Sequence, residues 1–307
     1  FNIPQGKTVG VVGESGCGKS VTSLSLMQLV QRPQGQIVKG AIRLNTGEEV
    51  YDIAKTPSSE MQKLRGNTVS MIFQEPMTSL NPVFRIGVQL DEVIALHNED
   101  MSKEDVKKRS IEMLELVGIA NSEGVYKMYP HELSGGMRQR IMIAMGIACN
   151  PRVIIADEPT TALDVTIQAQ ILELLRNLKD KINSSIMLIT HDLGVIAEMA
   201  DYVVVMYAGK IVERGTAEEI FKNPCHPYTI GLMNSKPVVG KEVDRLYSIP
   251  GKVPNPIDMP NYCYFKDRCE KRFGKCEAAY PHEIYLTPTH AVSCYLYDDK
   301  GEVKDGR

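Results

Sequence analysis

The stretch KTVGVVGESGCGKS, residues 7–20, carries the clearest pattern in this chain. KTVGVV is rich in β-branched residues, and SVTSLSLMQLV, residues 20–30, is apolar at helical spacing. GESGCGKS, residues 13–20, therefore lies between a strand and a helix and matches the pattern G-x-x-x-x-G-K-[ST]. Its glycines let several backbone N–H groups face one anion, and the helix N-terminus adds a positive dipole end. This pattern predicts a site for nucleotide phosphates.

Strand-like and helix-like patterns alternate along the rest of the chain, which predicts an α/β fold with a mostly parallel sheet. The further predicted strands are QIVKGAIRLN (36–45), NTVSMIF (67–73), RVIIAD (152–157), SSIMLIT (184–190) and DYVVVMY (201–207). Helical patterns fill about residues 83–150, which is too long for one crossover and indicates an inserted helical subdomain. After residue 224, prolines, tyrosines and cysteines accumulate and periodicity fades. We therefore predict one domain over residues 1–224 and a small cysteine-rich module over 225–307.

Composition excludes several classes of protein. The 307 residues include 35 Lys and Arg and 38 Asp and Glu, so the net charge is −3 and no basic excess indicates nucleic-acid binding. The chain has no apolar run long enough to span a membrane, and no signal peptide is visible in residues 1–307. Its cysteine count of 7 is odd, which fits a reducing compartment. The first residue is Phe1 and a strand follows almost at once, so we expect further residues before it, including N-terminal strands.

Two other stretches carry candidate chemistry. In RVIIADEPT, residues 152–160, Asp157 ends an apolar strand, where a carboxylate can reach Mg²⁺ through water. Glu158 follows, and a carboxylate beside a γ-phosphate can orient or deprotonate an attacking water. In LSGGMRQR, residues 133–140, Ser134 can cap a helix whose first N–H groups form a second anion site. Alone, each stretch would be interpreted as an ordinary strand end or helix cap. Because the same chain contains a phosphate-binding loop, both stretches are candidates for the nucleotide site.

Six motifs occur in a familiar order: GESGCGKS, Gln74, LSGGMRQR, VIIADEPT, TALD (161–164) and His191. Together they resemble the ATP-binding cassette (ABC) ATPases over about residues 1–220. The resemblance implies a P-loop NTPase core with an inserted helical subdomain. It also implies a head-to-tail dimer that holds two ATP molecules, with the phosphate loop of one protomer facing the LSGGM motif of the other.

The resemblance further implies a role for each motif. Ser20, Gln74 and Asp157 would hold Mg²⁺. Glu158 would be the catalytic base, assisted by Gln74 and by His191 at the γ-phosphate, and Asp164 would lie at the dimer seam. The residues expected to hold ATP are Gly13, Glu14, Ser15, Gly16, Cys17, Gly18, Lys19, Ser20, Ser134, Gly135 and Gly136. The aromatic residue that stacks on adenine in this family lies upstream of Phe1.

Three further stretches resemble the ATPase subunits of bacterial peptide importers, and nickel importers share part of the pattern. They are FQEPMTSLNPVFRIGVQLDEV (73–93), NPCHPYTIGLM (223–233) and IPGKVPNP (249–256). The implied partners are a second ABC ATPase subunit, identical or paralogous, two transmembrane permeases and, indirectly, an extracytoplasmic peptide-binding protein. The chain would be peripheral, on the cytoplasmic face of the cell membrane. The alternative is a soluble ABC ATPase acting on nucleic acid or ribosomes, but those proteins usually join two cassettes or carry coiled coils.

Four of the cysteines cluster near the C-terminus, at Cys263, Cys269, Cys276 and Cys294. Structural zinc sites favour C-x₂₋₄-C pairs, whereas the spacing here is C-x₅-C-x₆-C-x₁₇-C, which suits a bulkier group. In peptide-importer ATPases, the similar tail binds a 4Fe–4S cluster. The resemblance therefore implies that these cysteines hold an iron–sulfur cluster, with zinc as the alternative occupant.

Overall fold

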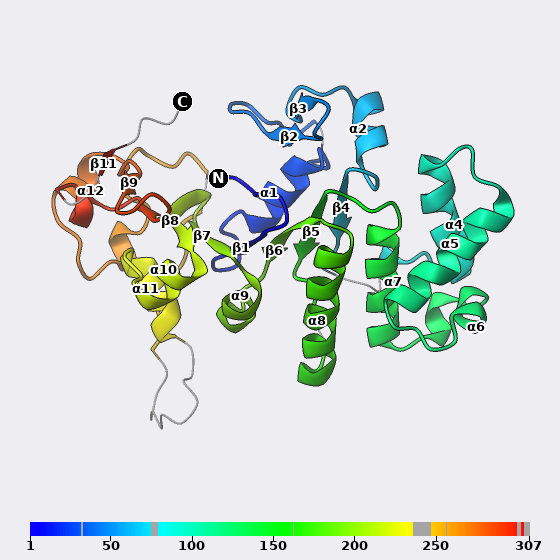
Figure 1. Cartoon of the computed structure of the whole chain (residues 1–307). Coiled ribbons are helices and arrows are strands. Elements are labelled where there is room, and N and C mark those ends of the chain that lie inside the picture. Colours follow the sequence, from blue (N-terminus) through cyan, green and yellow to red (C-terminus); the bar gives the residue numbers. More distant parts are fainter. Residues whose placement is uncertain are drawn as a thin grey trace. The chain divides into compact units, whose positions relative to one another are not determined.

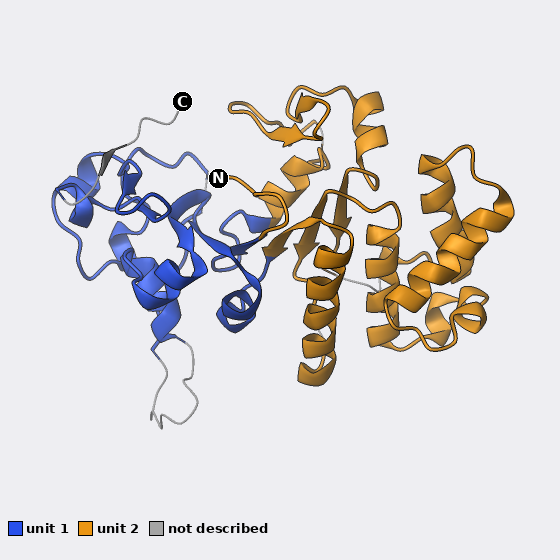
Figure 2. Ribbon diagram, in the orientation of Figure 1, with its two compact units in different colours: residues 1, 8–19, 189–307 blue, residues 2–7, 20–188 orange. Residues whose placement is uncertain are grey.

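The computed structural model describes residues 1–31, 33–74, 79–161, 163–235, 247–255, 257–299 and 302–303 (Figure 1). The chain divides into two compact units, which Figure 2 shows in different colours. Unit 1 comprises residues 1, 8–19 and 189–307, and unit 2 comprises residues 2–7 and 20–188. Each unit contains a continuous set of neighbouring strands, and each contains some of the residues predicted from the sequence to bind ATP or Mg²⁺.

The strands of unit 1 run in the order β11-β9-β10-β8-β7-β1. β1 (Thr8–Val12) and β7 (Tyr202–Tyr207) pair in parallel, and β8 (Lys210–Thr216) pairs antiparallel with β7. All five residues of β1 are buried, as expected for an apolar strand without polar alternation. The predicted cysteine-rich module, residues 225–307, is called the tail below. It extends this sheet, because β10 (Ala291–Val292) pairs antiparallel with β8. The last two strands are β9 (Ile284–Tyr285) and β11 (Glu302–Val303).

Unit 1 also contains four short helices among its described residues, and polar side chains cap three of them. Asp192 caps α9, and Thr216 and Glu219 form a capping box at α10. The side chain of His226 accepts the Tyr228 N–H at the start of α11. The helices are α9 (Leu193–Met199), α10 (Ala217–Lys222), α11 (Pro227–Asn234) and α12 (Lys275–Ala278), with 3₁₀ turns at Lys266–Arg268 and Tyr295–Tyr297.

In unit 2 the strand order is β6-β5-β4, and β4 pairs in parallel with β5. A separate hairpin joins β2 to β3, and α8 buries one apolar face through Ile171, Leu172, Leu175 and Leu178. These elements are α1 (Lys19–Leu26), β2 (Arg43–Asn45), β3 (Val50–Asp52), α2 (Ser58–Leu64), β4 (Val69–Ile72), β5 (Val153–Asp157), α8 (Val165–Lys181) and β6 (Ser185–Ile189). Lys19 and Ile189, at the ends of α1 and β6, belong to unit 1.

Helices fill the stretch between β4 and β5, as the sequence predicts. Asp91 on α4 accepts hydrogen bonds from Ser110 on α5 and from Tyr126 on α6, each at 2.5 Å, and so ties three helices together. The helices are α4 (Ile86–His97), α5 (Lys103–Leu116), α6 (Ser122–Tyr126) and α7 (Gly135–Ile147), with a 3₁₀ turn at Pro130–Glu132. This arrangement is the helical subdomain of the predicted fold.

One predicted strand is mostly wrong. Of QIVKGAIRLN, residues 36–45, only Arg43–Asn45 is a strand. Gly40 has a φ of +94°, which breaks an extended run, and the Val38 side chain is exposed. The predictions at β1, β4, β5, β6 and β7 are confirmed. Among the described residues, no helix is long and apolar enough to cross a membrane.

Candidate functional site

The phosphate-binding loop directly follows β1 in unit 1. The Lys19 side chain is buried, and its Nζ donates to the backbone oxygens of Gly13 at 2.8 Å and Glu14 at 3.1 Å. A Cβ at Gly13 would lie 2.2 Å from the Met206 backbone oxygen, so no larger residue fits there. Gly16 and Gly18 have φ values of +80° and +101°, which favour glycine. The loop shape therefore requires the glycines of the motif.

The side chains of the loop serve different purposes. Cys17 is fully buried, and burial raises the pKa of its thiol, so it packs inside the loop as an uncharged group. The backbone N–H of Glu14 donates to the Tyr228 hydroxyl, and the Glu14 carboxylate accepts a hydrogen bond from Arg268. The sequence patterns did not predict either partner. Ser15 and Gly16 are exposed.

Unit 2 brings together the predicted magnesium ligands Ser20 and Asp157. Asp157 ends β5 and is buried. Its Oδ1 accepts a hydrogen bond from Ser20 Oγ at 3.4 Å, and its Oδ2 accepts one from Ser23 Oγ at 3.0 Å. Hard oxygen donors in this arrangement suit Mg²⁺. Ser23 was missed, although its place three residues after Ser20 on α1 puts both hydroxyls on one face of the helix.

Gln74 and Glu158 also meet in unit 2. Gln74 Nε2 donates to Glu158 Oε2 at 3.1 Å, and Thr161 Oγ1 donates to the same oxygen at 2.9 Å. Glu158 has a φ of +46°, in the left-handed region that is unfavourable for a side chain. Such backbone strain concentrates at functional sites. The structure thus joins two predicted catalytic residues that are 84 positions apart in the sequence.

The LSGGM motif opens α7, as predicted. Ser134 is the N-cap, and its side chain accepts the Met137 N–H at 3.3 Å. Ser134 and Gly135 are exposed, and a Cβ at Gly135 would meet no other atom within 4 Å. Asp164 caps α8 by accepting the Ile167 N–H at 2.9 Å. Both helix starts are therefore ordered by their own caps, and the N-terminus of α7 is open.

His191 lies in unit 1, two residues after β6, and is exposed. The predicted site residues are thus divided between the units. Unit 1 holds the loop residues 13–19 and His191, whereas unit 2 holds Ser20, Gln74, Asp157, Glu158 and the LSGGM motif. Residues 75–78, which follow Gln74 in the importer-like stretch, lie outside the described residues.

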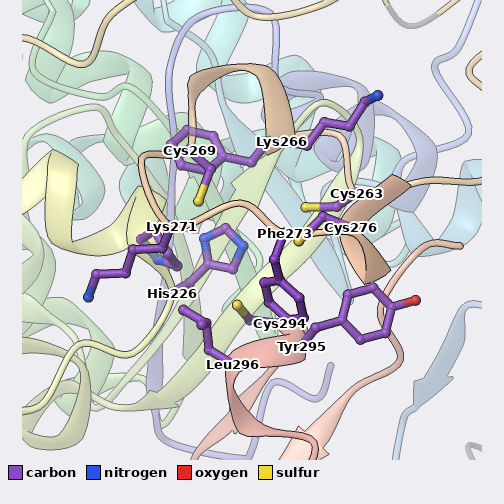
Figure 3. Close-up of a pocket in the computed structure, with 12 residues that line it drawn as sticks. His226, Cys263, Lys266, Cys269, Lys271, Phe273, Cys276, Cys294, Tyr295 and Leu296 are labelled. Atoms are coloured by element: carbon purple, nitrogen blue, oxygen red, sulfur yellow. The ribbon is translucent and has the colours of Figure 1, made fainter. Parts of the chain in front are cut away.

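The four cysteines of the tail line one pocket. Figure 3 shows the sulfur atoms of Cys263, Cys269, Cys276 and Cys294 around a common space beside His226. The pocket has a volume of about 320 Å³, which includes space open to solvent. Burial and the neighbouring thiols raise the pKa of Cys263 to about 11 and that of Cys294 to about 12. A cation would be needed to make such thiols into thiolates near neutral pH.

Two family models match the chain. The ABC transporter model matches residues 1–161, and the model of the oligopeptide/dipeptide transporter C-terminal region matches residues 212–276. The chain belongs to the ABC transporter family. It is 52% identical over 301 residues to the oligopeptide transport ATP-binding protein AppD of Bacillus subtilis, covering 98% of this chain and 90% of that protein. The dipeptide transport ATP-binding protein DppD of Bacillus subtilis is 47% identical over 302 residues, with coverage of 98% and 89%.

Solved structures confirm the ABC fold. The ATP-binding cassette MJ0796, in a dimeric post-hydrolysis state bound to ADP and Pi, matches with a TM-score of 0.61 and 26% identity. The match covers 71% of this chain and 88% of that chain. The present chain, as a member of the ABC transporter family, is an ATPase, as its motifs predict.

Proposed function

We propose that this chain is the ATP-hydrolysing subunit of a peptide importer, acting with a second ABC ATPase subunit, two permeases and an extracytoplasmic peptide-binding protein. The observation that carries the proposal is the similarity to oligopeptide and dipeptide transport proteins, which extends from the phosphate loop into the tail. An ABC ATPase acting on nucleic acid or ribosomes is the alternative, and the transport-specific C-terminal region disfavours it.

Each site residue has a proposed role in ATP binding or hydrolysis. The backbone N–H groups of residues 13–19 and the Lys19 ammonium bind the phosphates, while Ser20, Gln74 and Asp157 would hold Mg²⁺. Glu158 takes the proton of the attacking water, which Gln74 helps to orient, and His191 contacts the γ-phosphate. In the ATP-bound dimer, Ser134, Gly135 and Gly136 close on the γ-phosphate held by the partner subunit. Hydrolysis removes that anion, so the dimer opens and moves the permeases.

A 4Fe–4S cluster held by Cys263, Cys269, Cys276 and Cys294 is the proposed occupant of the tail pocket. A tetrahedral zinc ion at about 2.3 Å would bring its sulfur ligands within about 3.8 Å of one another. In the described part of the chain, no three of these sulfur atoms lie within 4.8 Å of each other. The wider spacing and the shared pocket favour a cluster, whose iron would supply the positive charge that keeps the thiolates ionised.

Transport can be tested with the complete complex. The chain is co-expressed with the membrane proteins encoded beside it and purified from detergent-solubilised membranes, and we expect two polytopic proteins to co-purify. Proteoliposomes of that complex, with its binding protein, should take up a fluorescent tetrapeptide only with MgATP. Uptake of Ni²⁺ without peptide would contradict the peptide assignment. Recovery with ribosomes or nucleic acid, and with no membrane protein, would contradict the importer.

The cluster has a separate test. Protein purified without oxygen should be brown and contain about four irons and four sulfides per chain. Cys269→Ser should lose the colour, whereas the matched control Cys149→Ser should keep it, because Cys149 does not line the pocket. Colourless anaerobic protein with one zinc per chain would show that zinc holds the tail together instead.

A further inference from the structure

The tail and the phosphate loop share a partly buried ion pair. Arg268, in the tail, donates from its two terminal nitrogens to the two carboxylate oxygens of Glu14, at 2.6 Å and 3.0 Å. The Arg268 side chain is 5% exposed and that of Glu14 is 31% exposed. A bidentate, charge-assisted pair of this kind is stronger and more directional than a surface salt bridge.

Arg268 is itself held in place by the tail. Its Nε donates to the Pro250 backbone oxygen at 2.7 Å, and a terminal nitrogen donates to the Ile249 oxygen at 3.3 Å. Its guanidinium carbon lies 5.7 Å from the centre of the Tyr207 ring and 5.9 Å from that of Phe265. These contacts hold the guanidinium in one position independently of Glu14. Little further side-chain entropy is therefore lost when Arg268 binds Glu14.

A second group holds the backbone of the same loop residue. Tyr228, on α11, is fully buried, and its hydroxyl accepts the Glu14 N–H at 2.7 Å. Its ring packs against those of Tyr207, at 4.8 Å between centroids, and Phe265, at 5.5 Å. The side chain and the N–H of Glu14 are thus both bound by residues that follow the cassette motifs in the sequence.

The position of Glu14 makes this pair consequential for ATP. A carboxylate in a loop that binds phosphates would repel the nucleotide if its charge were not compensated. Arg268 supplies that compensation by binding the Glu14 carboxylate, while the Lys19 ammonium binds the Gly13 and Glu14 carbonyls of the same loop. We propose that Arg268 is a positioning residue of the phosphate loop, so that the tail completes the nucleotide site. This inference deepens the proposed function, because it assumes that ATP binds at this loop.

The test is the affinity of the full-length protein for a fluorescent ATP analogue carrying a methylanthraniloyl group, measured with Mg²⁺. Arg268→Gln should weaken binding about 10-fold, the effect of losing one interaction to a charged group. Arg268→Lys should recover part of the loss, because it keeps the charge without the bidentate geometry. The double variant Glu14→Gln/Arg268→Gln should bind more tightly than Arg268→Gln, because it leaves no uncompensated carboxylate beside the phosphates.

The chain offers a matched control at Arg214. This β8 residue makes a bidentate pair with Glu283 of the tail, at 2.7 Å and 2.6 Å, and therefore links the tail to β8 and not to the phosphate loop. Arg214→Gln should leave ATP affinity within about twofold of wild type. Equal loss in Arg214→Gln and Arg268→Gln would overturn the proposal, because general tail docking would then explain both.

Two further outcomes distinguish failure of the Arg268 proposal from failure of the proposed ATP-binding function. Wild-type affinity in Arg268→Gln overturns the positioning role alone, whereas failure of the wild-type protein to bind the analogue overturns the proposed ATP site. If Arg268→Gln does not fold, Tyr228→Phe tests the same idea, since it removes only the hydroxyl that accepts the Glu14 N–H. It should weaken binding about threefold, and unchanged binding would contradict the proposal.

Discussion

One carboxylate oxygen of Glu158 accepts two hydrogen bonds, and the Glu158 backbone has an energetically unfavourable conformation. Its left-handed φ of +46° is unfavourable by about 1–2 kcal/mol for a residue with a side chain. Gln74 and Thr161 both donate to its Oε2 and so fix the carboxylate where β5 ends. An ordinary strand end would need neither the strain nor the two hydrogen bonds. At the scale of the residue, this combination is the strongest structural support for a catalytic role.

Replacing this carboxylate tests that role. Glu158→Gln should slow ATP turnover by roughly 10²–10⁴-fold, because an amide cannot take a proton from water. ATP binding should persist, since its charge complement comes from Lys19 and backbone N–H groups. The measurement is steady-state phosphate release beside nucleotide affinity, with Glu173→Gln on the exposed face of α8 as the matched control. A Glu158→Gln protein free of contaminating ATPase that turns over at the wild-type rate would remove Glu158 from the mechanism.

At the scale of the element, β8 anchors the tail through one buried carboxylate. Glu213 accepts the N–H groups of Cys225 at 2.7 Å and His226 at 2.8 Å, and its Oε1 lies 2.8 Å from His290 Nε2. Glu213, Cys225 and His290 place ligand atoms within 4.8 Å of one another, but these hydrogen bonds already account for their grouping. The three contacts join β8, the start of α11 and the residue before β10.

This anchor should depend on pH. Burial alone would lower the pKa of His290, but hydrogen bonds to Cys225 and Glu213 outweigh it and raise the pKa to about 10. Because the folded-state pKa lies above the ordinary value of about 6.5, the pair contributes its full stability below that pH. That contribution, of the order of a few kcal/mol, should be lost as pH rises towards 10.

Proteolysis can measure this loss. Cleavage within residues 257–299 should accelerate as pH rises from about 7 to about 10, compared with cleavage in α5 of the same sample. In His290→Gln, which has no titrating ring, the tail should be cleaved more readily at pH 7 and its rate should change less with pH. A tail with the same pH profile in both proteins would show that His290 is uncharged or contributes nothing to the anchor.

The elements also show what sequence patterns can and cannot predict. The long helices between Ile86 and Ile147 and the buried strands β1, β5, β6 and β7 carry enough periodic or continuous apolar sequence to be recognised. The tail strands β9 and β10 have two residues each, too few to show alternation, and β8 and α10 were not predicted. The strand-end motif predicted Asp157 and Glu158 as site residues, and the family resemblance implied Gln74, but sequence reasoning of this kind is limited to such motifs. It could not predict the pairing of Glu14 with Arg268, because 254 residues separate them and only folding brings them together.

At the scale of the whole molecule, the tail is continuous with the strand that leads into the phosphate loop. β10 pairs with β8, β8 with β7, and β7 with β1, so one run of paired strands connects the tail to Val12. Phe265 is buried among Tyr207, Tyr228 and His226, and burial lowers the pKa of His226 to about 4, so its ring is neutral there. The cysteine-rich tail therefore folds as part of unit 1, and a change in the tail should alter nucleotide binding at the phosphate loop.

Arg268 lies directly before Cys269, so loss of the proposed cluster should disturb the contact between Arg268 and the phosphate loop. Cys269→Ser should remove the proposed cluster, loosen the 3₁₀ turn Lys266–Arg268 and release the guanidinium from Glu14. Affinity for the fluorescent ATP analogue should then fall about 10-fold, as for Arg268→Gln. Adding Arg268→Gln to Cys269→Ser should cause little further loss, because both changes break one contact. Cys149→Ser is the control, and a cluster-free Cys269→Ser protein with wild-type affinity would show that Arg268 holds the loop without help from the metal centre.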